Sequence, residues 1–247
     1  MCPRCADFFI TLQAKCADQP SFLWTIGQTT LSTMKRINLK NALPAVFAGR
    51  EDTGSQIWLR DVAFEKGKYY LISAESGTGK SSLCSYIYGF RSDYSGAITF
   101  DGTHISTLSV KDWCDIRCRH LAYLPQELRL FHELTALENL LLKNNITGFK
   151  SKEEILRLFD TFGIADKTDS LVAHLSIGQQ QRVAIIRTLC QPYDFLVLDE
   201  PVSHLDSTNN AIVAEVVCAE AKKQGAGIIA TSVGNNVMIN IDEEYKL

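Results

Sequence analysis

The sequence predicts an α/β fold, in which helices cover a sheet of short strands. Short apolar runs typical of strands alternate along the chain with segments of helical period. A glycine-rich loop lies between one such strand and the helix that follows it. The composition, 46% hydrophobic and 21% charged, is typical of a globular chain, and 247 residues suit one α/β domain, alone or with a subdomain.

Charge and apolar patterning exclude several classes of protein. The net charge is −3 and the basic residues are scattered, so we expect no nucleic-acid partner. No apolar run approaches the ~18 residues that a membrane-spanning helix needs, so membrane association would require a partner. Eight cysteines without a secretory signal indicate free thiols in a reducing cytoplasm, and we interpret Cys2-Pro3-Arg4-Cys5 as an incidental pair rather than a zinc site.

The start of the chain differs from the rest. Residues 1–33 show no structural period and contain Pro3 and Pro20, whereas a strand pattern begins after Met34. We interpret residues 1–33 as an N-terminal extension that is either poorly ordered or the product of a wrongly assigned start codon. The domain then covers residues 34–247.

The first predicted elements of this domain are strands. Residues 35–39, 57–59 and 69–72 are short runs of strand type. Residues 97–100 are predicted to pair with the residues after Asp101-Gly102, because this dipeptide favours the tight turns that match the twist of two paired strands.

Two helices are predicted from their ends and from their apolar spacing. We expect one at about 81–88, ended by Gly89. Another is expected at 151–162, with Ser151 as its N-cap, acidic residues in its first turn and Gly163 at its end.

Residues 74–81, Ala-Glu-Ser-Gly-Thr-Gly-Lys-Ser, form the strongest local motif. Glycines at 77 and 79 let backbone amides converge on phosphate oxygens at a helix N-terminus. Lys80 would reach the β and γ phosphates and the Ser81 hydroxyl would bind magnesium, so the motif predicts a P-loop. Ala74 replaces the usual first glycine, which is tolerated if its φ is negative. The alternative is a glycine-rich turn with an exposed lysine.

A second motif is a buried strand, predicted at 195–198, that ends in Asp199 and Glu200. Ligands of open α/β sheets bind at the carboxyl ends of the strands. There Asp199 would hold magnesium through water, and Glu200 would orient or deprotonate an attacking water. The alternative is an ordinary buried strand that ends in acids, and the P-loop motif favours the catalytic interpretation.

A third motif, Leu-Ser-Ile-Gly-Gln-Gln-Gln-Arg-Val-Ala at 175–184, predicts a capped helix. Ser176 is the expected N-cap, and Gln179 completes a capping box. By itself the pattern indicates only an amphipathic helix.

Over about residues 37–240 the order of these motifs resembles that of the ATP-binding cassette (ABC) family. The stretch LSIGQQQRVAIIRTL resembles the family signature, and its Ser176 lies 96 residues after Lys80 and 23 before Asp199. Both intervals are ordinary for a transporter cassette.

Three further segments add to the resemblance. Tyr-Leu-Pro-Gln at 123–126 resembles the glutamine loop, in which Gln126 would touch magnesium and sense a transmembrane partner. Residues 134–140 resemble the segment that follows this loop. Ser-His-Leu-Asp at 203–206 resembles the loop that crosses the dimer interface of the family.

The resemblance implies a P-loop NTPase fold, the ABC nucleotide-binding domain. It would contain a RecA-like core, an antiparallel β-subdomain and an α-helical signature subdomain at about 127–178. The implied cofactors are ATP and Mg²⁺, and Phe47 would stack on the adenine. The implied residues are Phe47, Ser76, Gly77, Thr78, Gly79, Lys80, Ser81, Ser82, Ser176, Gly178 and Gln179 for the nucleotide, Glu200, Gln126 and Ser232 for catalysis, and Ser81, Gln126 and Asp199 for the metal.

The resemblance also implies partners. Two cassettes would pack head to tail, with each ATP between the loop at 74–82 of one and the signature at 176–179 of the other. A separate transmembrane permease would hold the pair at the inner face of the cell membrane. Residues 123–200 resemble most the branch of the family that powers lipoprotein release, macrolide efflux and division-associated complexes.

Two residues depart from the family pattern. Ile177 replaces the first signature glycine, so either the backbone there is helical or closure of the dimer is weakened. Ser232, 32 residues after Glu200, stands where the family has its switch histidine. A neutral serine cannot supply the same contacts, and losing one such contact costs about 10²–10³ in rate. His204 is the nearest histidine in sequence and the candidate for a compensating role, although a structural or solvent-facing role is its ordinary interpretation.

Three functions remain open at this point. The first is an ATP-hydrolysing subunit of a transporter, which Lys80 and Glu200 favour. The second is an ATP-dependent dimerisation switch with little hydrolysis, which Ile177 and Ser232 favour. The third, a DNA-repair or ribosome-associated cassette, fits poorly because the interval between Lys80 and Ser176 leaves no room for a long coiled coil.

Overall fold

The computed structural model describes residues 33–50, 53–75, 77–234 and 236–247. Residues 33–247 form one compact unit. The predicted N-terminal extension and the pair of cysteines within it lie outside the described residues, so both interpretations remain predictions.

A four-stranded antiparallel sheet has the order β2-β1-β4-β5. Its strands are β1 (Arg36–Pro44), β2 (Asp61–Glu65), β4 (Tyr94–Phe100) and β5 (Thr103–His104). The predicted first strand is thereby confirmed. The hairpin is confirmed too, because β4 and β5 pair across a turn in which Asp101 (φ 48°) and Gly102 (φ 88°) are left-handed.

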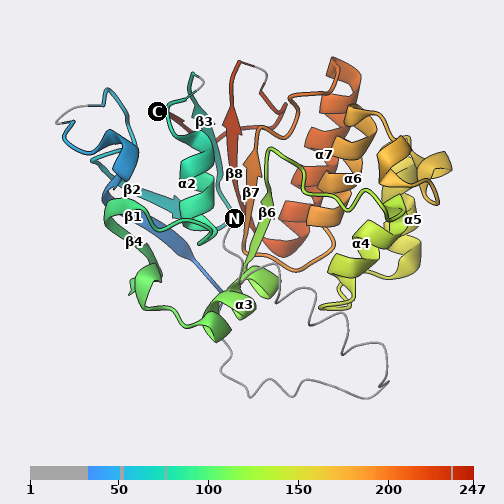
Figure 1. The fold of residues 1–247 in the computed structure, drawn as a ribbon, viewed down its shortest axis with the longest axis horizontal. Coiled ribbons are helices and arrows are strands. Elements are labelled where there is room, and N and C mark those ends of the chain that lie inside the picture. The colour runs from blue at the N-terminus through green and yellow to red at the C-terminus, as the bar shows by residue number, and fades with distance from the viewer. Residues whose placement is uncertain (1–32, 51–52, 76, 235) are drawn as a thin grey trace. The chain divides into compact units, whose positions relative to one another are not determined.

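A five-stranded parallel sheet, in the order β6-β7-β8-β3-β9, occupies the centre of Figure 1. Its strands are β6 (Leu121–Leu124), β7 (Phe195–Asp199), β8 (Gly227–Ser232), β3 (Tyr69–Ser73) and β9 (Glu243–Lys246). The helices of the described residues are α2 (Lys80–Ile87), α3 (Val110–Arg119), α4 (Ala136–Asn144), α5 (Lys152–Thr161), α6 (Ile177–Thr188) and α7 (Ser207–Gln224).

The parallel sheet separates two hydrophobic cores. Along β7, Leu196 and Leu198 enter the core formed with α4, α5, α6 and α7. Phe195 and Val197 enter the other core, formed with α2 and the antiparallel sheet. Strand side chains alternate between faces, so a strand buried on both faces needs the continuous apolar run that the sequence shows.

The strand predicted at 57–59 is wrong, because these residues form turns. The buried Ser55 hydroxyl accepts hydrogen bonds from the amides of Ile57 (3.0 Å) and Trp58 (2.9 Å), and Leu59 is left-handed (φ 58°). The side-chain oxygen takes the place of a strand partner for these amides.

Both predicted helices are confirmed. In α5, Ser151 is the N-cap and forms a capping box with Glu154, and Gly163 (φ 63°) follows the last turn. In α2, the helix ends before Gly89, where two features require glycine: φ is 71°, and an added Cβ would lie 2.4 Å from the Trp113 ring.

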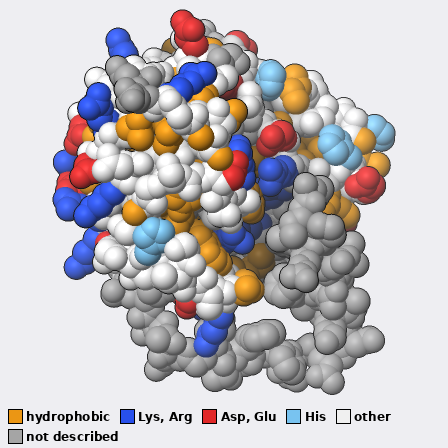
Figure 2. All heavy atoms as spheres, turned by 60° about the vertical axis from the view of Figure 1, so that its left-hand side comes forward, with side chains coloured by type: hydrophobic (Ala, Val, Ile, Leu, Met, Phe, Trp, Pro, Cys, Tyr) orange, Lys and Arg blue, Asp and Glu red, His pale blue; other side chains and the backbone are white. Residues whose placement is uncertain are grey.

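The surface mixes charged and apolar groups. Figure 2 shows Lys and Arg side chains interspersed with acidic ones, and hydrophobic side chains reaching the surface between them. Several large apolar side chains are exposed, among them Phe90 (45%) and Phe131 (47%). Within the described residues no helix combines the length and hydrophobicity needed to cross a bilayer.

Candidate nucleotide-binding and catalytic site

The glycine-rich loop connects β3 to the N-terminus of α2. Gly77 (φ 83°) and Gly79 (φ 101°) are both left-handed, and α2 begins at Lys80. The loop therefore ends at free helix amides and at the positive end of the helix dipole, which suits a phosphate. Ala74 is not among the left-handed residues, so its methyl group replaces the usual glycine without strain.

Two aromatic side chains lie against this loop at Gly79. A Cβ at this position would lie 3.2 Å from the Trp58 ring and 3.3 Å from the Phe47 ring. Trp58 is 2% exposed, and its indole N–H donates to the Thr78 carbonyl (3.2 Å). The structure thus places Phe47 beside the loop, as expected for a residue near the nucleotide. The contact of Trp58 with the loop was not predicted from the sequence. The available signal was a tryptophan in a short apolar run before the loop.

Lys80 is buried at the centre of the site, with 5% of its surface exposed. Its ammonium group donates to the carbonyls of Ala74 (3.1 Å) and Glu75 (2.7 Å). Its Nζ atom also lies 4.0 Å from Oε1 of Glu200. The alternative of an exposed lysine on a glycine-rich turn is therefore wrong.

Asp199 ends β7 on the same face as α2. The Ser81 hydroxyl hydrogen-bonds its carboxylate, and the Thr231 hydroxyl donates to Oδ1 (2.8 Å). Burial raises the pKa of Asp199, and these two hydrogen bonds offset part of the rise. A carboxylate beside a serine hydroxyl is a hard oxygen donor pair of the kind that Mg²⁺ prefers.

Glu200 follows in a left-handed conformation, with φ at 51°. The Gln126 amide, in the turn after β6, donates to its Oε2 (3.2 Å). The structure thus brings Lys80, Gln126, Asp199 and Glu200 together from three segments at one edge of the parallel sheet. The alternative of a strand that merely ends in acids does not account for this convergence.

Two buried polar residues behind Glu200 were missed by the sequence analysis. Thr231 accepts a hydrogen bond from the Glu200 amide (3.1 Å), and Gln181 donates to the Glu200 carbonyl (3.4 Å). Gln181 also accepts from the His204 amide (3.1 Å). A threonine that interrupts the apolar strand at 227–231 was the available signal for the first of them.

The remaining loop residues are placed as follows. Ser232 is buried (1% exposed) at the end of β8, opposite Ser73, and its carbonyl accepts from the Ala74 amide (3.3 Å). Ser82 accepts a hydrogen bond from Arg91 (2.9 Å). Ser76 lies outside the described residues. Their predicted roles remain predictions.

The signature segment forms the first turn of α6. Ser176 is the N-cap and makes the predicted capping box with Gln179. Ile177 is the first helical residue and its side chain is 52% exposed, so a helical backbone accommodates the replaced glycine. A Cβ on Gly178 would lie 3.2 Å from the His204 carbonyl. Figure 1 shows α6 apart from α2, so one chain does not bring the signature to its own loop.

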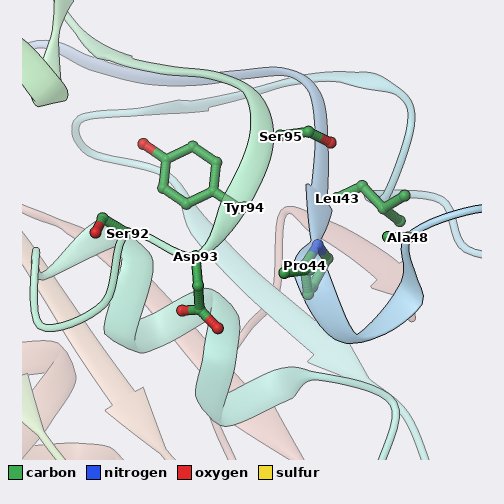
Figure 3. Close-up of a pocket in the computed structure, with 8 residues that line it drawn as sticks. Leu43, Pro44, Ala48, Ser92, Asp93, Tyr94 and Ser95 are labelled. Atoms are coloured by element: carbon green, nitrogen blue, oxygen red, sulfur yellow. The ribbon is translucent and has the colours of Figure 1, made fainter.

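A cavity of about 310 Å³ lies elsewhere, between the end of β1 and the start of β4 (Figure 3). None of the predicted site residues lines it. Its walls include Leu43, Pro44 and Tyr94, which make it largely apolar.

Within the described residues, no group of three or more His, Cys, Asp or Glu side chains is arranged to hold a metal ion. A metal ion beside Asp199 would therefore need other oxygen donors, such as hydroxyl, amide and phosphate groups.

Comparisons with known proteins identify the family of this chain. The family described as ABC transporter matches residues 60–203, more than half of the chain. The lipoprotein-releasing system ATP-binding protein LolD of Treponema denticola is 31% identical over 189 residues, 75% of this chain and 83% of that protein. The macrolide export ATP-binding/permease protein MacB of Mannheimia succiniciproducens is 30% identical over 207 residues, 83% of this chain and 32% of that protein.

A solved structure shares the fold. The dimeric ATP-binding cassette MJ0796, in a post-hydrolysis state bound to ADP and Pi, superposes with a TM-score of 0.68 at 24% identity, covering 81% of this chain and 88% of that one. The fold is therefore that of an ABC cassette, a P-loop NTPase. Together with the family match and the relatives above, it shows that the chain belongs to the ABC transporter family, as one of its ATPase subunits.

Proposed function

We propose that this chain binds Mg²⁺-ATP on the loop at 74–82, hydrolyses it slowly with Glu200, and powers a separate membrane permease. The observation that carries the proposal is the convergence on Glu200, which lies 4.0 Å from the Lys80 ammonium and accepts a hydrogen bond from Gln126 at 3.2 Å. A lysine for the phosphates and a carboxylate for the attacking water thus share one edge of the sheet.

The residues fit both ligands. The loop amides and Lys80 would hold the phosphates, and the Phe47 ring, already beside Gly79, would stack on the adenine. Ser81, Asp199 and Gln126 supply the hydroxyl, carboxylate and amide oxygens that suit Mg²⁺, which would neutralise phosphate charge when bound.

Glu200 would orient or deprotonate the attacking water, and Gln126 would hold its second carboxylate oxygen in place. Ser232 stands at the switch position without a histidine ring. We therefore expect turnover below that of a site with histidine by about 10²-fold, the usual effect of one missing contact in a preorganised site.

The proposed site is completed by a second cassette. Ser176, Gly178 and Gln179 begin a helix whose first amides would face the γ-phosphate held by the other subunit. The relatives named for lipoprotein release and macrolide export support a permease as the further partner and a place at the inner face of the membrane.

The second candidate function is an ATP-dependent dimerisation switch that signals to a membrane protein with little hydrolysis. Ser232 at the switch position and the exposed Ile177 at the start of the signature helix favour it. Both functions need nucleotide binding, but only the first needs Glu200 to act on water.

Phosphate release from Mg²⁺-ATP separates these functions. The purified chain is compared with its Glu200→Gln and Ser232→His variants, and ATP-induced dimerisation is followed by size-exclusion chromatography. We expect slow wild-type turnover, none with Glu200→Gln, and faster turnover with Ser232→His. Wild-type turnover equal to that of Glu200→Gln, with dimerisation intact, would favour the switch. Absence of Mg²⁺-ATP binding by the folded chain would refute both.

A further inference from the structure

The backbone of Glu200 is held in a conformation that glutamate avoids. Its φ of 51° is in the left-handed region, where the Cβ of an L-residue crowds its own backbone. Such a conformation persists only when the surrounding structure over-determines it. The residue follows β7 directly, so its two peptide groups decide where the carboxylate points relative to Lys80.

The amide side of Glu200 is fixed by Thr231. In the parallel pair of β7 and β8, Thr231 lies opposite Asp199. Its hydroxyl donates to Oδ1 of Asp199 (2.8 Å) and accepts from the Glu200 amide (3.1 Å). Thr231 is 1% exposed, so water does not compete for either bond. One hydroxyl thus connects the Asp199 carboxylate to the Glu200 amide.

The carbonyl side of Glu200 is fixed by Gln181, from α6. Its amide nitrogen lies 3.4 Å from the Glu200 carbonyl and 3.4 Å from the Ser203 hydroxyl, and its oxygen accepts from the His204 amide (3.1 Å). Gln181 is 2% exposed. The turn that follows Glu200 is therefore tied to the helix that begins with the signature segment.

From these contacts we infer that Thr231 and Gln181 are positioning residues that hold the Glu200 backbone from both sides, with Thr231 the principal one. The inference rests on the proposed role of Glu200 in hydrolysis and adds the residues that orient Glu200. Neither side chain needs to touch the nucleotide. Their removal should slow the chemical step and leave nucleotide binding nearly unchanged, because Lys80 and the loop stay in place.

The test compares kcat and KM for Mg²⁺-ATP in the full chain. Thr231→Val keeps the shape and the β-branch of the side chain but removes the hydroxyl. We expect kcat to fall about 10- to 100-fold, as for other residues that orient a catalytic group, with KM changed less than about threefold. Thr231→Ser keeps the hydroxyl and is expected to restore most of the rate.

The matched control is Thr188→Val. Thr188 is another buried threonine (6% exposed), and its hydroxyl donates to the Ala184 carbonyl (2.8 Å) within α6. Thermal melting of each variant reports folding. If Thr231→Val does not fold, Gln181→Met tests the carbonyl side with the same expected loss in kcat and unchanged KM.

The outcomes separate this inference from the function on which it rests. Turnover retained by Glu200→Gln refutes the proposed function itself. Turnover abolished by Glu200→Gln, with Thr231→Val equal to Thr188→Val, overturns only the positioning role. A loss in Thr231→Ser as large as in Thr231→Val overturns it too, because packing of the methyl group and not the hydroxyl would then matter. A fall in kcat confined to Thr231→Val and Gln181→Met supports it.

Discussion

Asp194, just before β7, joins three parts of the fold that are distant in sequence. Its Oδ2 accepts hydrogen bonds from the Met34 amide (2.7 Å) and from Nδ1 of His120 (2.6 Å), and its Oδ1 accepts one from Lys66. The side chain is 9% exposed. The carboxylate thus ties the start of β1, the turn between β2 and β3, and the start of β6 to the start of β7.

We predict that Asp194→Asn destabilises the fold by about 2 kcal/mol. The amide oxygen can take the place of Oδ2 and keep two of the three bonds, but the amide nitrogen then faces the ammonium group of Lys66. The substitution therefore loses one charge-assisted hydrogen bond, which contributes roughly 1.5–3 kcal/mol in partly buried sites. The matched control is Asp93→Asn, which breaks an exposed pair with Arg91 and should cost less than about 1 kcal/mol.

The contribution of Asp194 to the free energy of unfolding should also depend on pH. Burial raises the pKa of Asp194, but hydrogen bonds from His120, Lys66 and the Met34 amide lower it further, so the folded-state pKa lies below the ordinary 3.8. A lowered pKa means that the ionised group stabilises the fold fully above 3.8 and loses this contribution as the pH falls through the folded-state pKa.

The measurement is the free energy of unfolding from urea titrations, for both variants and the wild type, at several pH values. We expect the gap between wild type and Asp194→Asn to be constant above about pH 5 and to narrow in acid. A gap at pH 7 no larger than that of Asp93→Asn, or one that widens in acid, would refute this account of the cluster.

Three other substitutions test different features. Gly96→Ala should cost more than about 2 kcal/mol in urea unfolding, because Gly96 is left-handed (φ 80°) and a Cβ would lie 2.2 Å from the Asn41 carbonyl oxygen. Ile177→Gly should change unfolding by at most about 1 kcal/mol, since the side chain is exposed, while lowering the ATP concentration needed for dimerisation in size-exclusion chromatography. Lys150→Met should cost about 1.5–3 kcal/mol in the same unfolding assay, because the buried Glu220 carboxylate loses its ion pair with Lys150 (2.5 Å) and keeps the one with Lys223 (2.5 Å).

Features that depend on neighbours in sequence were predicted well. The Ser151 N-cap and the turn at Asp101-Gly102 require contacts only within three or four residues. The run 57–59 was predicted wrongly because its composition is that of a strand, whereas its conformation depends on the Ser55 hydroxyl and on the docking of Trp58 against Thr78, 20 residues later.

The residues of the candidate site also fall into those that a local motif predicts and those that depend on distant partners. Lys80 and Glu200 were found because each belongs to a local motif. Thr231 and Gln181 were missed because their partners are distant, 31 and 19 residues away in sequence for the bonds to Glu200. A local motif indicates which residue contacts the ligand. The residues that orient this residue can be recognised only once the strands and helices are assembled.

The geometry around Glu200 also bears on whether Ser232, in place of the switch histidine, slows hydrolysis or abolishes it. A left-handed glutamate costs about 1 kcal/mol or more, so the surrounding structure must hold it in this conformation. Here the strained turn is kept, with buried side chains bonded to both of its peptide groups and with Lys80 and Gln126 facing its carboxylate. In the proposed mechanism, the replaced histidine therefore removes one contact from a site in which Glu200 still points toward Lys80. That combination favours slow hydrolysis over its absence, and it makes the ratio of wild-type to Glu200→Gln turnover the measurement on which the assignment depends.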